Sequence, residues 1–334
     1  MKVLLIGGTG LISTGIVESL LGRGAELTLF NRAQRRASPP GAVTIVGDRN
    51  APRDFEARFE HERFDVVIDM ICFAPSQAEA TVRAFAGRTA QLIFCSTVCT
   101  YGVDIPSSVL VDETFPLRPV SDYARNKVAC EQIFARASAA GQFALTIVRP
   151  SNTYGPGAPL IDQMEFDSVV WDRVERGLPV LCAGDGIGLW QSTHRRDVGR
   201  FFAYAAGNSR TYDQAFNATR DRVFTWRDYY REAAQALDTR AELVMVPAGW
   251  VVGKNPRRFA FLNEITRYHG AYSSLKAKAA VPELAGPTVD FVDGARETFA
   301  DTKARGAWRR HEDDAEYSAL VALALEQGCE QITA

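Results

Sequence analysis

One short segment of the chain carries a tyrosine and a lysine at a spacing that could do acid–base chemistry. In Ser121-Asp122-Tyr123-Ala124-Arg125-Asn126-Lys127, a segment predicted to begin a helix, Tyr123 and Lys127 lie one turn apart on the same face. Upstream, Thr97 stands at the end of a predicted strand, and Cys99 follows two residues later. A phenol, an ammonium and a hydroxyl that converge can move a proton to or from an alcohol. Taken alone, this spacing also arises by chance, so its meaning depends on the elements around it.

A glycine-rich loop near the N-terminus supplies the first of those elements. Gly7-Gly8-Thr9-Gly10-Leu11-Ile12-Ser13 directly follows a predicted strand at 2–6 and opens a predicted helix at 11–21. Glycines there allow a tight turn and let the backbone approach a pyrophosphate, which then sits on the helix N-terminus. Ser13 takes the usual third small position, and a plain tight turn is the alternative interpretation. The residues of this loop predicted to bind a dinucleotide are Gly7, Gly8, Thr9, Gly10, Leu11 and Ile12.

The end of the second strand indicates which dinucleotide binds. An acidic residue at that point binds the adenosine ribose of NAD, but here the strand at 26–30 ends in Phe30-Asn31-Arg32. A guanidinium in place of a carboxylate suits the 2′-phosphate of NADP. The sequence therefore favours NADP over NAD as the cofactor, with a solvated basic loop that continues to Arg35 and Arg36 as the alternative. Outside the glycine loop, the predicted cofactor-binding residues are Asn31, Arg32, Asp48, Arg49, Ile71, Tyr123 and Lys127.

Asp48 follows the third predicted strand, in Val46-Gly47-Asp48-Arg49. It is placed to accept a hydrogen bond from the adenine amino group. A surface turn is the other interpretation, because aspartate is common in turns.

The order of predicted elements gives the fold class. Apolar runs of strand length alternate with helical patterns through the first half of the chain, which predicts a parallel sheet with helices on both faces. The predicted fold is an α/β, Rossmann-type doubly wound parallel sheet of about six strands. These strands are predicted at 2–6, 26–30, 43–46, 65–70, 91–95 and 144–148, with later helices near 76–87 and 122–140.

The alternation loosens after Pro150, where Gly/Pro-rich loops begin. Residues 1–155 are predicted to form the dinucleotide-binding Rossmann domain, with a return segment near 192–225. Residues 156–191 and 226–330 are predicted to form a smaller, partly discontinuous C-terminal lobe that binds the substrate. Such a lobe would pack against the strand ends, where open α/β sheets bind their ligands.

The composition argues against several classes of binding partner. A formal net charge of -2 over 334 residues gives no reason to expect nucleic acid or an anionic membrane. No apolar run is long enough to span a bilayer, and glycines follow the first strand where a signal peptide would continue. The six cysteines are scattered without a CxxC pair, and the four histidines lie far apart, so we expect no metal site and a cytoplasmic location.

With these motifs in place, the sequence resembles the extended short-chain dehydrogenase/reductases, the NAD(P)-dependent sugar epimerase and dehydratase family. The matching stretches are residues 7–13, 96–102 (Ser-Thr-Val-Cys-Thr-Tyr-Gly), 122–127 and 149–156. The resemblance implies that Tyr123 is the general acid or base and that Lys127 holds the nicotinamide ribose. Lys127 and the cationic nicotinamide would lower the pKa of Tyr123 toward neutrality. Thr97 would hydrogen-bond the substrate oxygen that becomes a carbonyl.

The residues after Thr97 bear on the reaction. Dehydratases of this superfamily usually carry Asp-Glu directly after the threonine, whereas this chain has Val98-Cys99, which argues against that chemistry. Cys99 occupies the place of an acid/base cysteine in members similar to GDP-mannose 3,5-epimerase, or else it is a packed thiol. The loop after Gly155 offers Asp162 and Glu165 as partners but no lysine, so the similarity is incomplete.

The substrate-binding positions also depart from the pattern of the family. Trp190 stands where UDP-sugar epimerases typically place an arginine for the diphosphate. His194 and Arg195 could bind phosphate instead, and Asn152 matches a position that often contacts the phosphate or the sugar. The predicted substrate is a sugar, with a nucleotide sugar as the leading class. The predicted substrate-binding residues are Thr97, Asn152, Asp162, Glu165, Trp190, His194 and Arg195.

Three functional hypotheses follow from these residues. The first is an epimerase that works through a transient ketone and recycles its bound cofactor. The second is a net reductase or dehydrogenase of a keto-sugar or related alcohol that consumes NADPH. The third is a non-catalytic relative that binds RNA or acts as a scaffold. The near-neutral net charge argues against this hypothesis, as does the presence of Thr97, Tyr123 and Lys127. The resemblance also implies a homodimer through the helices near 76–87 and 122–140.

Overall fold

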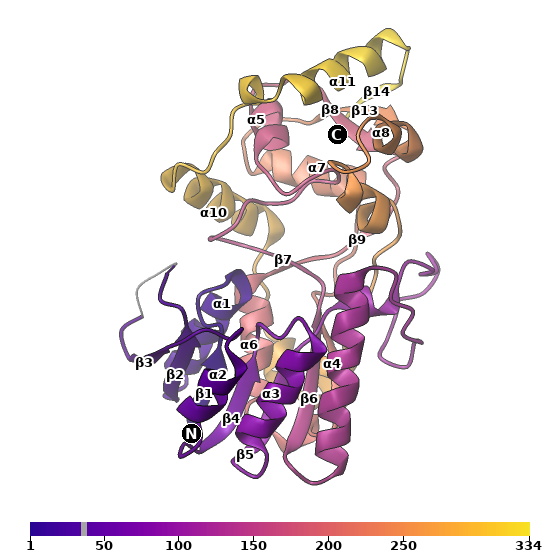
Figure 1. The fold of residues 1–334 in the computed structure, drawn as a ribbon. Helices are drawn as coiled ribbons and strands as arrows, with labels where there is room; N and C mark the ends of the chain where they lie inside the picture. The colour runs from indigo at the N-terminus through magenta and orange to yellow at the C-terminus, as the bar shows by residue number, and fades with distance from the viewer. Residues whose placement is uncertain (35–38) are drawn as a thin grey trace.

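The computed structural model describes residues 1–34 and 39–334, and a seven-stranded parallel sheet forms one end of the molecule (Figure 1). These strands read as nearly continuous apolar runs because both faces of a parallel sheet are covered. In spatial order the strands are β11 (Gln214–Ala218), β6 (Ala144–Pro150), β5 (Thr89–Cys95), β4 (Phe64–Asp69), β1 (Lys2–Ile6), β2 (Glu26–Asn31) and β3 (Ala42–Val46).

The first strand shows how helices come to cover both faces. Side chains alternate along a strand, so Leu4 and Ile6 of β1 pack into a cluster on one face while Val3 and Leu5 pack into a cluster on the other. All four side chains are fully buried. On the Leu4 face lie α2 (Pro52–Arg58), α3 (Pro75–Phe85) and α4 (Asp122–Ala139), and on the Val3 face lie α1 (Leu11–Gly22) and α6 (Arg195–Ala205).

This architecture confirms the predicted α/β Rossmann-type fold. The sheet has seven strands rather than about six, because β11 comes from the predicted return segment and pairs in parallel with β6. Helix α2 was not predicted either. With seven residues it is too short to show a helical repeat of apolar positions, although Pro52 at its first turn is a usual start signal.

The second lobe has its own core, which is rich in aromatic side chains. Trp171, Tyr229 and Tyr230 are fully buried there and pack on one another. Its three-stranded sheet runs β14 (Gln331–Thr333), β13 (Glu242–Val246) and β8 (Val180–Ala183). Its helices are α5 (Val169–Glu175), α7 (Trp226–Gln235), α8 (Ala248–Lys254), a π-helical turn at Leu262–Thr266, α10 (Phe291–Ala304) and α11 (Ala315–Glu326).

Short strand pairs connect the two lobes. Strand β7 (Asn152–Tyr154) pairs in parallel with β10 (Ser192–His194), and β9 (Leu189–Trp190) pairs antiparallel with β12 (Phe224–Thr225). Figure 1 shows β7 and β9 between the large sheet and the upper lobe. These crossings place the ends of the strands of the Rossmann sheet opposite the second lobe.

One segment differs from the predicted lobe boundaries. Helix α9 (Leu275–Ala280) lies within residues 226–330, which were predicted to belong to the substrate lobe. In the structure Ala277 and Val281 pack into the apolar cluster that contains α1 and α6. The segment therefore covers the Rossmann sheet, since its apolar side chains find their buried surface there.

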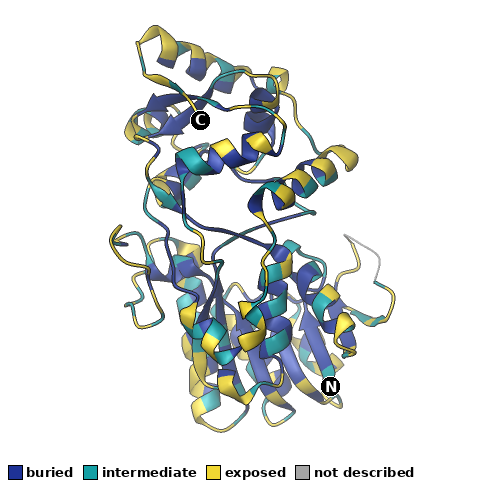
Figure 2. Ribbon diagram, turned by 180° about the vertical axis from the view of Figure 1, so that it is seen from behind, coloured by how far each residue is buried: buried dark blue, intermediate teal, exposed yellow. Residues whose placement is uncertain are grey.

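The buried residues lie in the cores of the two lobes. Figure 2 shows buried residues in the strands and on the inward faces of the helices, with exposed residues on the outer faces. Among the described residues, no helix is both long enough and apolar enough to cross a membrane.

Helices α1 and α6 touch backbone to backbone at two glycines. A Cβ on Gly15 would lie 2.2 Å from the carbonyl oxygen of Arg195, and a Cβ on Gly199 would lie 2.2 Å from the carbonyl carbon of Gly15. This close approach seats α1, and hence the glycine loop at its N-terminus, on the sheet. Ser13 was predicted from the sequence to take the small-residue position, and the contact at Gly15 and Gly199 was not predicted.

Replacing Gly199 with alanine is expected to lower the free energy of unfolding by about 1–3 kcal/mol, since the helices must separate. The loss should appear despite a gain of about 1 kcal/mol in helix propensity. Urea unfolding measures it. Gly22→Ala is the matched control, because no atom lies within 4 Å of a Cβ at that end of α1. Equal stability of the two variants would contradict the close-packing argument.

Candidate active site

The loop between β1 and α1 has no room for a side chain at Gly7 or Gly8. Gly7 has φ +97°, and a Cβ there would lie 2.6 Å from Cγ2 of Ile71. A Cβ on Gly8 would lie 2.7 Å from Cδ2 of Leu29. Helix α1 then begins at Leu11, and no side chain caps its first turn. Uncapped backbone N–H groups beside a stretch of bare backbone are the features that hold a dinucleotide pyrophosphate.

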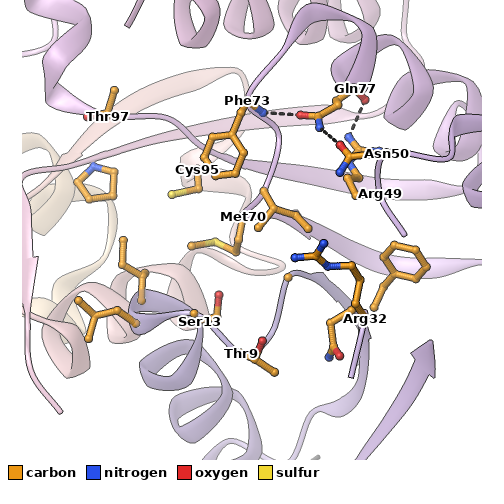
Figure 3. Close-up of a pocket in the computed structure, with 18 of the residues that line it drawn as sticks. Thr9, Ser13, Arg32, Arg49, Asn50, Met70, Phe73, Gln77, Cys95 and Thr97 are labelled. Atoms are coloured by element: carbon orange, nitrogen blue, oxygen red, sulfur yellow. Dashed lines mark hydrogen bonds between the residues drawn. The ribbon is translucent and has the colours of Figure 1, made fainter. Parts of the chain in front are cut away.

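A cavity of about 600 Å³ opens at this loop. It lies at the carboxyl ends of the strands, where the chain order of the sheet reverses between β1 and β4. Figure 3 shows Thr9 and Ser13 on one side of it and Phe73, Met70 and Cys95 on another. We call it the cofactor cavity. Many of the site residues predicted from the sequence line this cavity. They are Gly7, Thr9, Gly10, Leu11, Ile12, Asn31, Arg32, Asp48, Arg49, Ile71, Thr97, Tyr123 and Lys127.

Arg32 extends from the end of β2 into the cofactor cavity (Figure 3). The neighbouring Asn31 is occupied, because its Oδ1 accepts the N–H of Ala33 at 2.7 Å. Asp48 Oδ1 accepts the N–H of Asn50 at 2.9 Å, which makes the surface-type turn that the sequence left open. The guanidinium of Arg32 is therefore the group best placed to meet a 2′-phosphate. Arg35 and Arg36 fall outside the described residues.

Arg49 has a different environment from that of Arg32. Its buried Nη2 donates to Asp69 at 3.0 Å and to the carbonyl oxygen of Gln77 at 2.6 Å. The amide of Gln77 in turn donates to Asn50 and accepts the N–H of Phe73. Arg49 thus ties three loops of the cavity wall together through its charge, although it also lines the cavity.

Helix α4 positions Lys127. Ser121 caps the helix by accepting the N–H of Ala124 at 3.2 Å. Lys127 lies one turn further on and is fully buried, with Nζ donating to the carbonyl oxygens of Cys72 at 2.9 Å and Cys95 at 2.8 Å. The ammonium therefore joins the ends of β4 and β5 at the floor of the cavity.

The hydroxyl of Tyr123 meets that of Thr97 at the same end of the cavity. Burial raises the pKa of Tyr123, the thiols of Cys95 and Cys99 raise it further, and the hydrogen bond with Thr97 opposes them. The side chain of Lys127 lies 5.8 Å from the centre of the Tyr123 ring and is bonded elsewhere. The structure thus brings the three residues together, but the direct partner of the phenol is Thr97 rather than the ammonium.

Cys99 lies next to this group without the surroundings of a reactive thiolate. Burial raises the pKa of its thiol, although a hydrogen bond with Thr97 opposes the shift. A low pKa needs a neighbouring cation, and the causes acting on Cys99 include none. Burial therefore favours the protonated form of the Cys99 thiol, which lies beside Thr97, and its role as an acid or base stays a prediction.

Asp162 and Glu165 are not brought to the cofactor cavity. Oδ1 of the fully buried Asp162 accepts the N–H groups of Met164 at 2.5 Å and Glu165 at 3.2 Å, so it shapes its own loop. Glu165 forms an ion pair with Arg258 at 2.7 Å. Both carboxylates are engaged in the fold of the second lobe, and their role in substrate binding stays a prediction.

Three further predicted substrate residues lie at the junction of the lobes. Arg195 donates to the hydroxyl of Thr14 at 2.7 Å and pairs with Glu18 of α1 at 3.0 Å. Asn152 accepts from Ser192 in the neighbouring strand. His194 is buried and caps α6. None of the three lines the cofactor cavity, because contacts among β7, β10, α1 and α6 hold them, and their role in substrate binding stays a prediction.

The burial of His194 predicts that the stability of the fold depends on pH. Burial and the positive charge of Arg196 lower its pKa from 6.5 to about 4. Between these values the unfolded chain binds a proton that the folded chain does not, so stability falls as the pH drops from about 6.5 to about 4. The difference corresponds to about 3 kcal/mol.

His194→Asn keeps an oxygen to cap the N–H of Arg196 but cannot titrate. We expect its unfolding free energy to fall with acid by about 3 kcal/mol less than that of the wild type. Urea unfolding across this pH range measures the difference. His61→Asn, at an exposed histidine, is the control, and identical acid profiles of the two variants would contradict the prediction.

Several lining residues escaped the sequence analysis. Phe73 and Gln77 follow β4, and Ser96, Ser151 and Thr153 follow β5 and β6. Phe73, Ser96 and Ser151 lie within four residues after a strand of the large sheet, which is the local signal that could have indicated them, whereas Gln77 lies in α3 and Thr153 in β7.

Comparison with known proteins agrees with this geometry. A model of the NAD dependent epimerase/dehydratase family matches residues 3–218. The match confirms the resemblance predicted from the sequence. It covers the Rossmann sheet, the glycine loop, and the segment that carries Thr97, Tyr123 and Lys127.

Individual relatives differ in what they do. The 2′-dehydrokanamycin reductase of Streptomyces kanamyceticus is 28% identical over 269 residues, which cover 80% of this chain and 75% of that protein. The chloroplast stem-loop binding protein of 41 kDa b of Arabidopsis thaliana is 24% identical over 331 residues, 93% of this chain and 82% of that protein. A Thermus thermophilus UDP-glucose 4-epimerase solved in complex with NAD shares the fold, with a TM-score of 0.70, 24% identity and coverage of 91% and 99%.

Proposed function

The chain belongs to the NAD dependent epimerase/dehydratase family, and on that basis we propose that it moves a hydride between NADP(H) and a ring carbon of a sugar. One observation carries this proposal. Thr97 and Tyr123 line one end of the cavity that holds the glycine loop and Arg32, and their side chains are close enough to interact. Proton-transfer groups and a dinucleotide cradle in one cavity are what oxidation of an alcohol requires.

The residues that line the cofactor cavity are suited to binding a dinucleotide. The bare backbone at Gly7 and Gly8 and the uncapped start of α1 would hold the pyrophosphate, and Arg32 would hold the 2′-phosphate. Lys127 would donate to the nicotinamide ribose from the floor of the cavity. When bound, the nicotinamide accepts the hydride from the substrate or returns it.

The chain's own side chains then move the proton. Thr97 donates to the substrate oxygen and orients it toward Tyr123. In reduction the phenol of Tyr123 gives its proton to the substrate oxygen as the hydride arrives, and in the oxidation direction the phenolate form of Tyr123 takes that proton from the carbinol. Its raised pKa keeps the phenol protonated at neutral pH, which suits the reductive direction.

Net reduction of a keto-sugar by NADPH is favoured over a recycled cofactor. Arg32 in the cavity supports a phosphorylated dinucleotide, and net reduction commonly uses NADPH. The similarity to a reductase over 80% of the chain supports the same direction.

Epimerisation of a nucleotide sugar through a transient ketone is the second candidate. The same Thr97 and Tyr123 pair would serve it, and the fold shared with a UDP-glucose 4-epimerase supports it. Both candidates begin with one hydride transfer, so the fate of the cofactor distinguishes them.

The test is to denature the purified protein and identify the released dinucleotide by mass spectrometry. Near-stoichiometric oxidised dinucleotide would support the epimerase. Empty protein that binds NADPH reversibly would support the net reductase. Failure to bind either NAD(H) or NADP(H) would overturn both and favour a binding protein, the activity named for the Arabidopsis relative.

Arg32→Glu is expected to weaken NADP⁺ binding by about 10- to 100-fold, because a charge-assisted contact is replaced by repulsion. The new carboxylate should leave NAD⁺ affinity equal or improved, since it can accept from the ribose hydroxyls. Fluorescence titration with both dinucleotides measures the ratio. Arg53→Glu, an exposed residue at the start of α2, makes the same charge change as a control. An unchanged ratio in Arg32→Glu would rule out recognition of the 2′-phosphate by Arg32.

Two assignments complete the proposal. The six free cysteines support a reducing compartment such as the cytoplasm. A homodimer through the outer faces of α3 and α4 is expected from the family resemblance. Light scattering on the purified protein tests it.

A further inference from the structure

A second cavity, of about 30 Å³, lies between the two lobes next to Thr97 and Tyr123. We call it the Trp190 cavity. The Rossmann side contributes the turn after Thr97 and the residues before Tyr123, and the second lobe contributes Trp190 and the segment 264–272. Its lining residues are Cys99, Gly102, Val103, Val120, Ser121, Trp190, Glu264, Ile265, Tyr268, His269, Gly270 and Tyr272.

Short links tie the Trp190 cavity to the reacting groups. The N–H of Cys99 donates to the hydroxyl of Thr97 at 3.2 Å, and Ser121 is the cap of the helix that carries Tyr123. The thiol of Cys99 raises the pKa of both Tyr123 and Tyr272, so it lies within electrostatic reach of both phenols. A sugar whose carbinol meets Thr97 and Tyr123 therefore presents its neighbouring substituent to this cavity.

Two residues of the walls carry side-chain N–H donors. Trp190 is 7% exposed, and among the described residues its Nε1 has no partner. The indole stacked on it at 4.9 Å, Trp226, donates instead to the carbonyl oxygen of Thr266. Nδ1 of His269 accepts the N–H of Leu189 at 3.1 Å, which places the proton of the neutral imidazole on Nε2. Two residues of the cavity wall thus carry side-chain N–H groups for which no partner is found among the described residues.

The walls also offer an acceptor, and their charge differs from that of the cofactor cavity. Glu264 is an exposed carboxylate among the lining residues. No lysine or arginine is among the described residues that line the Trp190 cavity, whereas Arg32, Arg49 and Lys127 line the cofactor cavity. A phosphate placed here would meet a carboxylate and no cation.

Size and polarity together define the occupant. About 30 Å³ holds one or two groups the size of water. A hydroxyl has two lone pairs and one proton, which match two N–H donors and one carboxylate. An ammonium has no lone pair for the donors, and a deoxy position would leave them unpaired in a buried site.

Resting on the proposed hydride transfer, we propose that the Trp190 cavity binds a free hydroxyl on the ring position next to the reacting carbon. The N–H groups of Trp190 and His269 donate hydrogen bonds to the oxygen of this hydroxyl, and the carboxylate of Glu264 accepts a hydrogen bond from its O–H. The substrate class is therefore a sugar or glycoside with an unmodified hydroxyl at that position, and deoxy, amino and phosphorylated analogues are rejected there.

The experiment uses methyl glycosides of glucose, galactose and mannose with their deoxy and amino analogues. NADPH formation from NADP⁺ gives kcat/KM for each in the full chain. We expect the hydroxyl form of the accepted sugar to exceed its deoxy analogue by at least about tenfold. Trp190→Phe keeps the ring stack but loses the N–H, and His269→Asn keeps the acceptor for Leu189 but loses Nε2–H. Each should reduce that preference by about tenfold.

Trp226→Phe is the control, because it removes the other N–H of the same stack, which a backbone carbonyl occupies. It should lower stability and leave the preference unchanged. A preference that survives in both Trp190→Phe and His269→Asn would overturn the inference while leaving the proposed hydride transfer intact. If no glycoside is oxidised and none raises the Tm of the NADP⁺-loaded protein, the inference is also overturned, and the dinucleotide-release assay still judges the proposed function independently.

Discussion

Replacing Tyr123 with phenylalanine is expected to lower kcat by about 10²- to 10⁴-fold, the range for loss of a general acid or base. The phenol hydrogen-bonds Thr97 at the end of the cofactor cavity. Phenylalanine keeps the ring beside Phe73, 6.4 Å away between ring centres, and removes only the hydroxyl. Affinity for NADP(H) should stay within about threefold, because the phenol is one of many contacts with so large a ligand. Steady-state kinetics and a fluorescence titration together measure both quantities.

The matched control is Tyr204→Phe. That residue lies on α6 with its ring beneath the guanidinium of Arg23, at 3.8 Å from the ring centre, and does not line the cofactor cavity. It loses the same hydroxyl and should retain full activity. A Tyr123→Phe enzyme with wild-type kcat would show that another group transfers the proton, and the assignment of Tyr123 would have to be abandoned.

The replacement of Lys127 by methionine should lower kcat/KM by about 10²- to 10³-fold. The side chain would lose a charge-assisted contact with the ribose, and the floor of the cavity would lose its alignment. Two buried carbonyl oxygens, of Cys72 and Cys95, would also lose their donor. The unfolding free energy should therefore fall by about 1–3 kcal/mol. NADPH titration, kinetics and urea unfolding separate the three effects.

Lys276→Met is the control for this change. Lys276 is half-buried, donates to the carbonyl oxygen of Ala215 at 3.0 Å and lies over the ring of Phe216 at 4.9 Å. It thus loses the same kind of contact away from the cavity, so stability should fall while kcat/KM stays unchanged. Lys127→Met with an intact fold and unchanged NADPH affinity would exclude the ribose contact.

Local sequence patterns were sufficient for the groups that act within one or two elements. The loop from Gly7 to Gly10 was recognisable because the strand before it and the helix after it are short-range features. Tyr123 and Lys127 were recognisable because a helix places residues four apart on one face. Strand ends at a common edge of a parallel sheet then bring Thr97 to the same place.

The same patterns were insufficient where a side chain's partner is distant in sequence. Glu165 is bound to Arg258 and Arg195 to Glu18, so neither reaches the cavity that its position along the chain suggested. The close approach of Gly15 and Gly199 was likewise invisible, since nothing in either helix alone requires it.

The sequence by itself indicated the fold class and the dinucleotide loop through local periodicity and strand order, and it predicted the Thr97, Tyr123 and Lys127 set through the resemblance to the family. Only the tertiary structure decided that Lys127 bonds two strand-end carbonyls rather than the phenol. It alone also placed Trp190, whose indole N–H has no partner among the described residues, and His269 in one cavity with Cys99, two residues after Thr97. The physical reason is that hydrogen bonding and burial depend on which distant segments pack together, and spacing along the chain does not contain that information.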